Sequence, residues 1–191
     1  MVLPPGMANK LWAAADLFAA QGADRTSVAE IAAATGIPKA TLYYHSVTKE
    51  VVLAWIFREL LGEVEEVVVE AAASDGPAPD RLRAVLRAHL ALFHRRRAAS
   101  AALQFDLGRA ARSPQIRDAA EASFIRPVSE LIAEGIREGT LVCSQAPRAV
   151  ALALLGAVNT TGIQLPRRAT SRQVAAAADD LADLFLKGLS P

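Results

Sequence analysis

The chain contains few cysteine and histidine residues, and this scarcity excludes several kinds of site. Cys143 is the single cysteine, so no intrachain disulfide can form and a reducing compartment is expected. One cysteine and three histidines, scattered over 191 residues, lack the close spacing of metal ligands. The sequence motifs of zinc proteases, serine hydrolases and phosphate- or dinucleotide-binding enzymes are also missing. We therefore expect no metal, no cofactor and no enzymatic activity.

The sequence also has no hydrophobic run long enough to cross a membrane. Its longest apolar stretch, Ala149 to Val158, is too short, because a spanning helix needs about 20 apolar residues. The stretch LWAAADLFAA near the N-terminus has the form of a secretory signal core, but Asp16 interrupts it and its helical period continues into the residues that follow. We expect a cytoplasmic protein with no membrane partner.

Strand patterns are almost absent, and the composition favours helices. Aromatic residues make up 5% of the chain and apolar residues 52%, with many alanines and leucines, which lose little entropy in a helix. The chain is therefore expected to be all-α, with about nine helices. These span about residues 7–21, 27–34, 38–45, 48–73, 81–97, 98–111, 114–138, 147–163 and 171–189. Pro127 should kink or split the seventh, because proline removes a helical hydrogen bond.

Turn-forming residues divide the chain into a lead and two domains. Residues 1–6 (MVLPPG) are expected to be disordered. Residues 7–47 are expected to form a three-helix domain, and 48–191 a larger helical domain for regulation, ligand binding and dimerisation. The clearest break, SDGPAPD at 74–80, lies inside the second domain.

Residues 27–46 are the most informative stretch, because two short helical patterns flank Gly36 there. Ile31 and Leu42 stand where the two helices of a helix-turn-helix bury a pair of side chains, and Ile37 stands in the turn. Gly36 suits a sharp turn, because a positive φ is cheap only for glycine. All these requirements are met together, so the stretch predicts a helix-turn-helix.

The second helix of this motif is expected to lie in the DNA major groove. Ser27 and Lys49 stand at helix starts, where partial positive charge attracts phosphates. Of three consecutive ring side chains, at least one must face inward, and Tyr43 or His45 could pack against a neighbouring helix. The candidate DNA contacts are Ser27, Lys39, Ala40, Thr41, Tyr43, Tyr44, His45 and Lys49.

Charge gives this motif little general support. The first sixty residues carry five basic and five acidic side chains, so binding would depend on local placement and not on a basic field. A helical protein-interaction module that has lost DNA binding is therefore the alternative function.

Residues 11–50 resemble the N-terminal domain of TetR-family transcriptional regulators. The resemblance rests on Ala13-Ala14 to Phe18, Gly22, Thr26-Ser27-Val28, Ile31-Ala32, Gly36, Thr41-Leu42-Tyr43-Tyr44-His45 and Lys49-Glu50. The family usually has an aromatic residue where Ser46 stands, and Val47 or Trp55 is expected to supply the missing packing. The resemblance implies a homodimeric repressor that binds a palindromic operator on double-stranded DNA and is released by a small hydrophobic effector.

Dimerisation is expected through the last two helices, where small and apolar residues gather, because a helix-turn-helix dimer needs two recognition helices about one DNA turn apart. An ordinary intrachain hairpin is the alternative. The candidate interface residues are Ala153, Gly156, Ala157, Leu181, Leu184 and Phe185. An effector pocket is expected among the fourth to eighth helices. Its candidate residues are Trp55, His89, Phe93, Gln104, Leu107, Phe124 and Asn159. Arg95–Arg97 is either a phosphate site or a solvated helix end.

Overall fold

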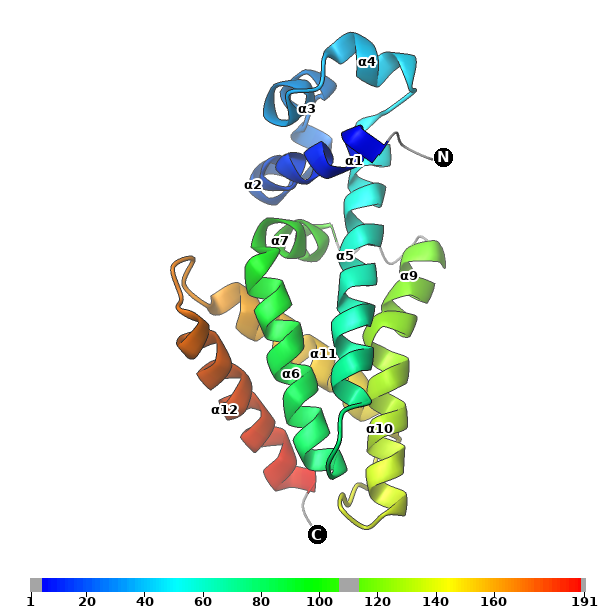
Figure 1. The fold of residues 1–191 in the computed structure, drawn as a ribbon, viewed down its shortest axis with the longest axis vertical. Coiled ribbons are helices and arrows are strands. Elements are labelled where there is room, and N and C mark those ends of the chain that lie inside the picture. The colour runs from blue at the N-terminus through cyan, green and yellow to red at the C-terminus, as the bar shows by residue number, and fades with distance from the viewer. Residues whose placement is uncertain (1–4, 107–113, 190–191) are drawn as a thin grey trace. The chain divides into compact units, whose positions relative to one another are not determined.

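The computed structural model describes residues 5–106 and 114–189, and these residues form helices joined by short connections (Figure 1). The elements are α1 (Pro5–Leu11), η1 (Trp12–Ala14), α2 (Ala15–Arg25), α3 (Val28–Thr35), α4 (Lys39–Tyr44), α5 (Lys49–Ala72), α6 (Ala78–Arg95), α7 (Arg97–Phe105), α9 (Pro114–Ala120), η2 (Glu121–Ile125), α10 (Arg126–Arg137), α11 (Pro147–Gln164) and α12 (Ser171–Leu189). Since α1, η1 and α2 are continuous, as are α9, η2 and α10, the described residues form nine helical stretches. The expected all-α fold is confirmed.

The chain divides into two compact units. The first contains residues 1–60 and 96–117, and the second contains 61–95 and 118–191. The first unit is larger than the expected domain of residues 7–47, because it also includes the start of α5 and all of α7, which packs along α2.

The first helical stretch begins earlier than expected and is interrupted where expected. Pro5 and Gly6, expected in a disordered lead, belong to α1, and the rest of that lead lies outside the described residues. Gly22 was expected to stop the first helix, and its φ of 73° does interrupt α2. A Cβ at Gly22 would lie 2.6 Å from the Phe105 ring of α7, so this residue also permits the close packing of the two helices.

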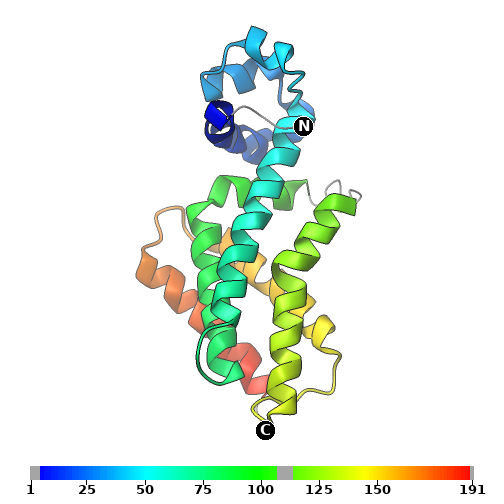
Figure 2. The ribbon, with the colours of Figure 1, turned by 45° about the vertical axis from the view of Figure 1, so that its right-hand side comes forward.

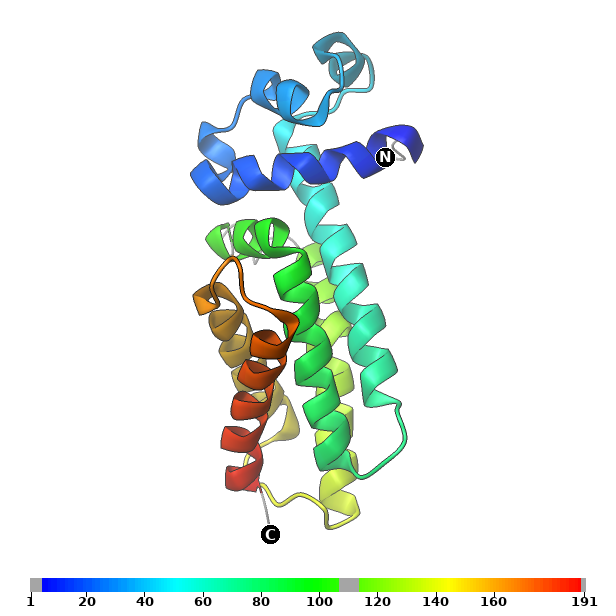
Figure 3. The same cartoon turned by 60° about the vertical axis from the view of Figure 1, so that its left-hand side comes forward.

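The second unit is a helical bundle in which α6 packs against α12, α10 and α11 (Figure 3). The expected apolar stripe of α6 is buried, including Leu82, Leu86 and Leu90. On the solvent side, the guanidinium of Arg87 donates to both oxygens of Asp179, at 2.6 and 2.7 Å. These ion pairs fix the register between α6 and α12 but contribute little stability, because they are exposed.

Pro127 was expected to kink or split its helix, and the structure has a change of helix type just before it. Segment η2 before it is a turn of π-helix, in which the Arg126 N–H donates to the Glu121 carbonyl five residues earlier. This wider turn accommodates the missing proline N–H, so α9, η2 and α10 form one continuous rod (Figure 2). Among the described residues, no helix has the length and apolarity to cross a bilayer.

Candidate nucleic-acid interface

The start of α3 is fixed by a reciprocal pair of hydrogen bonds. The Glu30 N–H donates to Ser27 Oγ at 3.2 Å, and the Ser27 N–H donates to Glu30 Oε2 at 2.8 Å. This is a capping box, which satisfies two backbone donors that a helix start leaves free. The hydrogen bonds from Ser27 also lower the pKa of the Glu30 carboxyl below its usual value.

The turn between α3 and α4 is as compact as the sequence predicts. Gly36 ends α3 with a φ of 65°, in the left-handed region. Thr35 Oγ1 donates to the Ile31 carbonyl at 2.7 Å and accepts from the Ile37 N–H at 3.3 Å. Ile31, Ile37 and Leu42 are all buried in the core of the first unit, as expected. Together these contacts set the angle at which α4 leaves α3.

Ser46, which stands where the family usually has an aromatic residue, helps to end α4. The Val47 N–H donates to the Leu42 carbonyl at 2.8 Å, and the Ser46 N–H donates to the Tyr43 carbonyl at 2.9 Å. This pair of bonds is a Schellman motif, whose penultimate position favours glycine because its φ is positive. Ser46 holds that position with a φ of 52°. Val47, buried beside Leu42, supplies the packing that was expected of it.

The outer face of α4 carries the side chains that sequence reasoning assigned to DNA. Tyr43 and Tyr44 are 60% and 82% exposed, and Lys39 and Ala40 are exposed beside them. His45 is half-buried, which makes it the least exposed of the three ring side chains. The structure thus gathers a basic and aromatic surface on one short helix held by defined turns at both ends.

Two further candidates, Ser27 and Lys49, have partners within the protein. Ser27 Oγ donates to the Glu30 carboxylate at 2.7 Å, which places a negative charge where a phosphate was expected. Lys49 Nζ donates to the Asp24 carbonyl at 3.0 Å. Thr48 caps α5 by accepting from the Val51 N–H at 3.4 Å. The side chains at the two flanks of the motif are therefore engaged in contacts within the first unit, whereas those on the outer face of α4 are exposed.

Sequence reasoning missed a source of positive charge. Residues 96–117 belong to the first unit and contain five arginines and one aspartate. The first unit therefore has four more basic than acidic residues, although residues 1–60 are balanced. A chain-order count could not reveal this, because the arginines join the unit only through folding. A basic field of this kind attracts polyanions over a distance.

The structure brings three of the seven effector candidates into direct contact inside the second unit. His89 Nε2 donates to Asn159 Oδ1 across 3.2 Å, and the His89 ring meets the Phe124 ring edge-on at 5.0 Å. Burial lowers the pKa of His89 to about 4, so the ring is neutral at pH 7. Its Nδ1 atom is buried without a hydrogen-bond partner among the described residues. Phe93 lies in the same unit, packed against Gly162.

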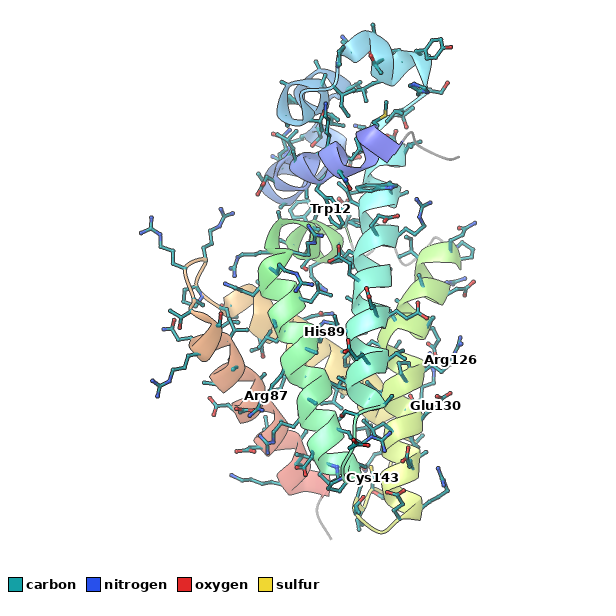
Figure 4. The ribbon with its side chains drawn as sticks, in the orientation of Figure 1. Trp12, Arg87, His89, Arg126, Glu130 and Cys143 are labelled. Carbon is teal, nitrogen blue, oxygen red and sulfur yellow. The ribbon has the colours of Figure 1, made fainter. Side chains whose placement is uncertain are left out.

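The remaining effector candidates lie elsewhere. Trp55 is buried in the first unit, where its ring lies 5.4 Å from that of Trp12 (labelled with His89 in Figure 4), and Gln104 is on α7 of that unit. Leu107 lies outside the described residues. The arginine run is divided as well, because Arg96 stacks on Trp12 at 4.3 Å while Arg95 belongs to the second unit.

Three of the exposed large apolar side chains lie on α11 and α12. Leu152 and Ile163 are each 43% exposed, and Leu184 is 70% exposed. Of the interface candidates, Ala153 and Gly156 are exposed, and Ala157 and Phe185 are half-buried. Leu181 differs from them, because it packs into the core of its own unit. A surface groove of about 370 Å³ runs between the helices, lined by Ala149, Ala153, Leu184 and Phe185 among others.

No group of three or more histidine, cysteine, aspartate or glutamate side chains within residues 5–106 and 114–189 could hold a metal ion.

No curated protein sequence matches the chain. A family model described as bacterial regulatory proteins, tetR family, matches residues 11–54, and one described as tetracyclin repressor-like, C-terminal domain, matches residues 75–163. The two models together span more than half of the chain.

Solved structures agree with this assignment over nearly the whole length. The ketosteroid transcriptional regulator KstR2 of Mycobacterium tuberculosis is 19% identical, with a TM-score of 0.83 and coverage of 100% of this chain and 97% of its own. A tetR-family regulatory protein from Rhodococcus RHA1 is 26% identical, with a TM-score of 0.82 and coverage of 96% and 98%. AibR, solved in complex with isovaleryl coenzyme A and operator DNA, is 27% identical, with a TM-score of 0.73 and coverage of 93% and 96%. The chain belongs to the tetR family of bacterial regulatory proteins and is a DNA-binding transcriptional regulator, not an enzyme.

Proposed function

We propose that the protein is a cytoplasmic, homodimeric repressor that binds a palindromic operator and is released by a small lipophilic effector. The observation that carries this proposal is the outer face of α4, where Lys39, Ala40, Tyr43 and Tyr44 are exposed on one helix. Lysine can bind phosphates or guanine edges, tyrosine can bind phosphates, and alanine allows a close approach to a thymine methyl group. The compact caps on α3 and α4 reduce the ordering cost of docking.

The apolar face of α11 and α12 supports the dimer. A helix-turn-helix regulator reads two half-sites about one DNA turn apart, so it needs a second recognition helix. Leu152, Ile163 and Leu184 are exposed along α11 and α12, and Gly156 has open space where a side chain would stand. A two-fold axis would bury this self-complementary surface against the same surface of a second copy.

The cluster of His89, Phe124 and Asn159 supports an effector site in the second unit. A buried ring nitrogen without a partner costs about 1–3 kcal/mol, and a ligand donor that reached it would recover that cost. The surrounding side chains are apolar, which favours a lipophilic compound. Because AibR was solved with isovaleryl coenzyme A, acyl-coenzyme A thioesters are the first compounds to test.

The experiment begins with selection of binding sites by the wild-type protein from random double-stranded DNA. The variant Lys39→Ala/Tyr44→Ala is then compared with the wild type on the selected duplex, with Arg137→Ala, an exposed residue on α10, as the surface control. We expect the double variant to lose binding by 10-fold or more and the control to bind normally, because each good base contact contributes about 1–3 kcal/mol.

Equal binding by the double variant would exclude α4 as the DNA-reading surface. Failure of the wild type to select any duplex would reject the repressor and leave the protein-interaction module. Effector release is tested by adding isovaleryl coenzyme A and longer acyl thioesters to the complex, and a coupling of about 1–3 kcal/mol would weaken binding five- to 150-fold.

A further inference from the structure

A hollow of about 290 Å³ lies between α1 and α4 in the first unit, next to the proposed recognition helix. Met7 and Lys10 of α1 line one side, and Pro38, Thr41 and His45 line the other. The hollow opens at the surface, so a group bound on the side of α4 would come close to α1. The resemblance places the first helix in the DNA-binding domain, but sequence reasoning named no DNA contact on it, because nothing in the chain order places residue 10 beside residue 41.

Lys10 occupies a fixed backbone position on this rim. Met7 and Leu11, on the turn around it, are 7% and 0% exposed and belong to the core of the first unit. Lys10 itself is exposed. Within the described part of the chain, its ammonium group makes no hydrogen bond or ion pair.

The other lysines around α4 are more constrained. Lys39 lies over the Tyr43 ring, with Nζ 5.6 Å from the ring centre. Lys49 donates to the Asp24 carbonyl. Of these three lysines, Lys10 has the fewest contacts within the protein, and it lies on the rim of the hollow that also includes Thr41 and His45.

We propose that Lys10 contacts the sugar–phosphate backbone of the operator and positions α4 in the groove from the side of α1. The inference rests on the proposed function, because it requires α4 to dock on DNA. Phosphate is the occupant that fits, since duplex DNA carries one negative charge per about 1.7 Å of its axis. A contact of this kind fixes orientation and carries no sequence information.

The test measures operator affinity against salt for the wild type and Lys10→Gln, on the duplex selected by the wild type. Each lost phosphate contact makes the slope of log affinity against log salt shallower by about 0.9. With two copies of Lys10 in a dimer, the advantage of the wild type should shrink roughly 10-fold between 50 and 200 mM salt. Lys10→Arg should keep the wild-type slope. Arg58→Gln, an exposed charge of the same unit on α5, is the matched control and should change the slope much less.

Two outcomes overturn the inference. One is an unchanged slope in Lys10→Gln; if affinity is then lower by the same factor at all salt concentrations, the residue has a structural role, which a lower melting temperature of Lys10→Gln would corroborate. The other is a slope change no larger than that of Arg58→Gln. If the wild type selects no duplex, the proposed function fails first and takes this inference with it; if the wild type binds and only the slope test fails, Lys10 alone is excluded.

Discussion

The two compact units distribute charge and apolar surface in opposite ways. The first unit has an excess of four basic residues and exposes lysine and tyrosine on α4. The second has an excess of three acidic residues and exposes leucine and isoleucine on α11 and α12. A polyanion is attracted to the first kind of surface, whereas a matching apolar face is stabilised by the second. The contrast is consistent with the proposal above, in which the first unit contacts DNA and the second unit forms the dimer.

Each unit buries polar side chains, and two threonines and one histidine show that these are not all paired to the same extent. In the first, Thr26 and Thr35 are buried, and each hydroxyl donates to a carbonyl one turn earlier, at 2.8 and 2.7 Å. In the second, His89 is 4% exposed and keeps one ring nitrogen without a described partner. The paired threonine hydroxyls leave no donor unused, whereas the unpaired Nδ1 of His89 leaves one buried acceptor in the second unit that a ligand donor would satisfy.

Introducing a charge on α12 should have the largest effect, because it would remove the apolar character that distinguishes the surface of the second unit from that of the first. In Leu184→Glu, a carboxylate replaces the most exposed large aliphatic side chain of the second unit. If α11 and α12 form the dimer seam, burying this group in two symmetry-related copies should weaken association by about 2–6 kcal/mol. Light scattering coupled to size-exclusion chromatography would show the shift from dimer to monomer, and operator affinity would fall with it.

Val69→Glu is the control for this change. Val69 is 47% exposed on α5 of the same unit, away from both proposed seam helices in sequence. It should leave the dimer intact. A dimer that survived Leu184→Glu at micromolar concentration would place the interface on another surface.

Acidification should affect the second unit through His89. Burial lowers its pKa from 6.5 to about 4, so the unfolded chain binds the proton more tightly than the folded one. The stability that comes from the neutral ring is therefore complete above about pH 6.5 and is lost as the pH falls toward 4. Linkage gives a loss of about 2 kcal/mol between pH 7 and pH 5. Urea unfolding at the two pH values measures it.

His89→Gln should remove this part of the pH dependence, whatever its effect on stability at pH 7. Glutamine does not titrate, so the difference between the two pH values should become smaller by about 2 kcal/mol. An identical pH dependence in both proteins would mean that His89 keeps a normal affinity for protons and is not sealed from water.

The sequence predicted the all-α fold and the helix-turn-helix because both depend on local patterns. Periodic apolar residues located Ile31 and Leu42, and the Ser27–Glu30 spacing predicted a cap that the structure contains. It also placed His89, Phe124 and Asn159 together as candidates. It failed where folding joins distant segments: Trp55 packs with Trp12 in the first unit, and the arginines of 96–117 join that unit too. No local period reveals such partnerships.

Ser46 shows how a local departure from a family pattern acquires a physical meaning only in the fold. The expected aromatic is not needed there for packing, because Ser46 is exposed and the neighbouring Val47 is buried. What the position demands is a left-handed backbone, which Gly36 meets at the end of α3 with a φ of 65° and Ser46 meets at the end of α4 with a φ of 52°. The two ends of the motif thus impose the same conformation on different residues.

Ser46→Gly should therefore stabilise the first unit by about 0.5–1 kcal/mol, because a residue with a Cβ is strained in the left-handed region. Gly36→Ala is the matched opposite change and should destabilise it by about 1 kcal/mol, although a Cβ there would meet no atom within 4 Å. Thermal melting of both variants measures the pair. If Ser46→Gly were neutral while Gly36→Ala was destabilising, the end of α4 would not hold the Schellman geometry in solution, and the recognition helix would be held by α3 alone.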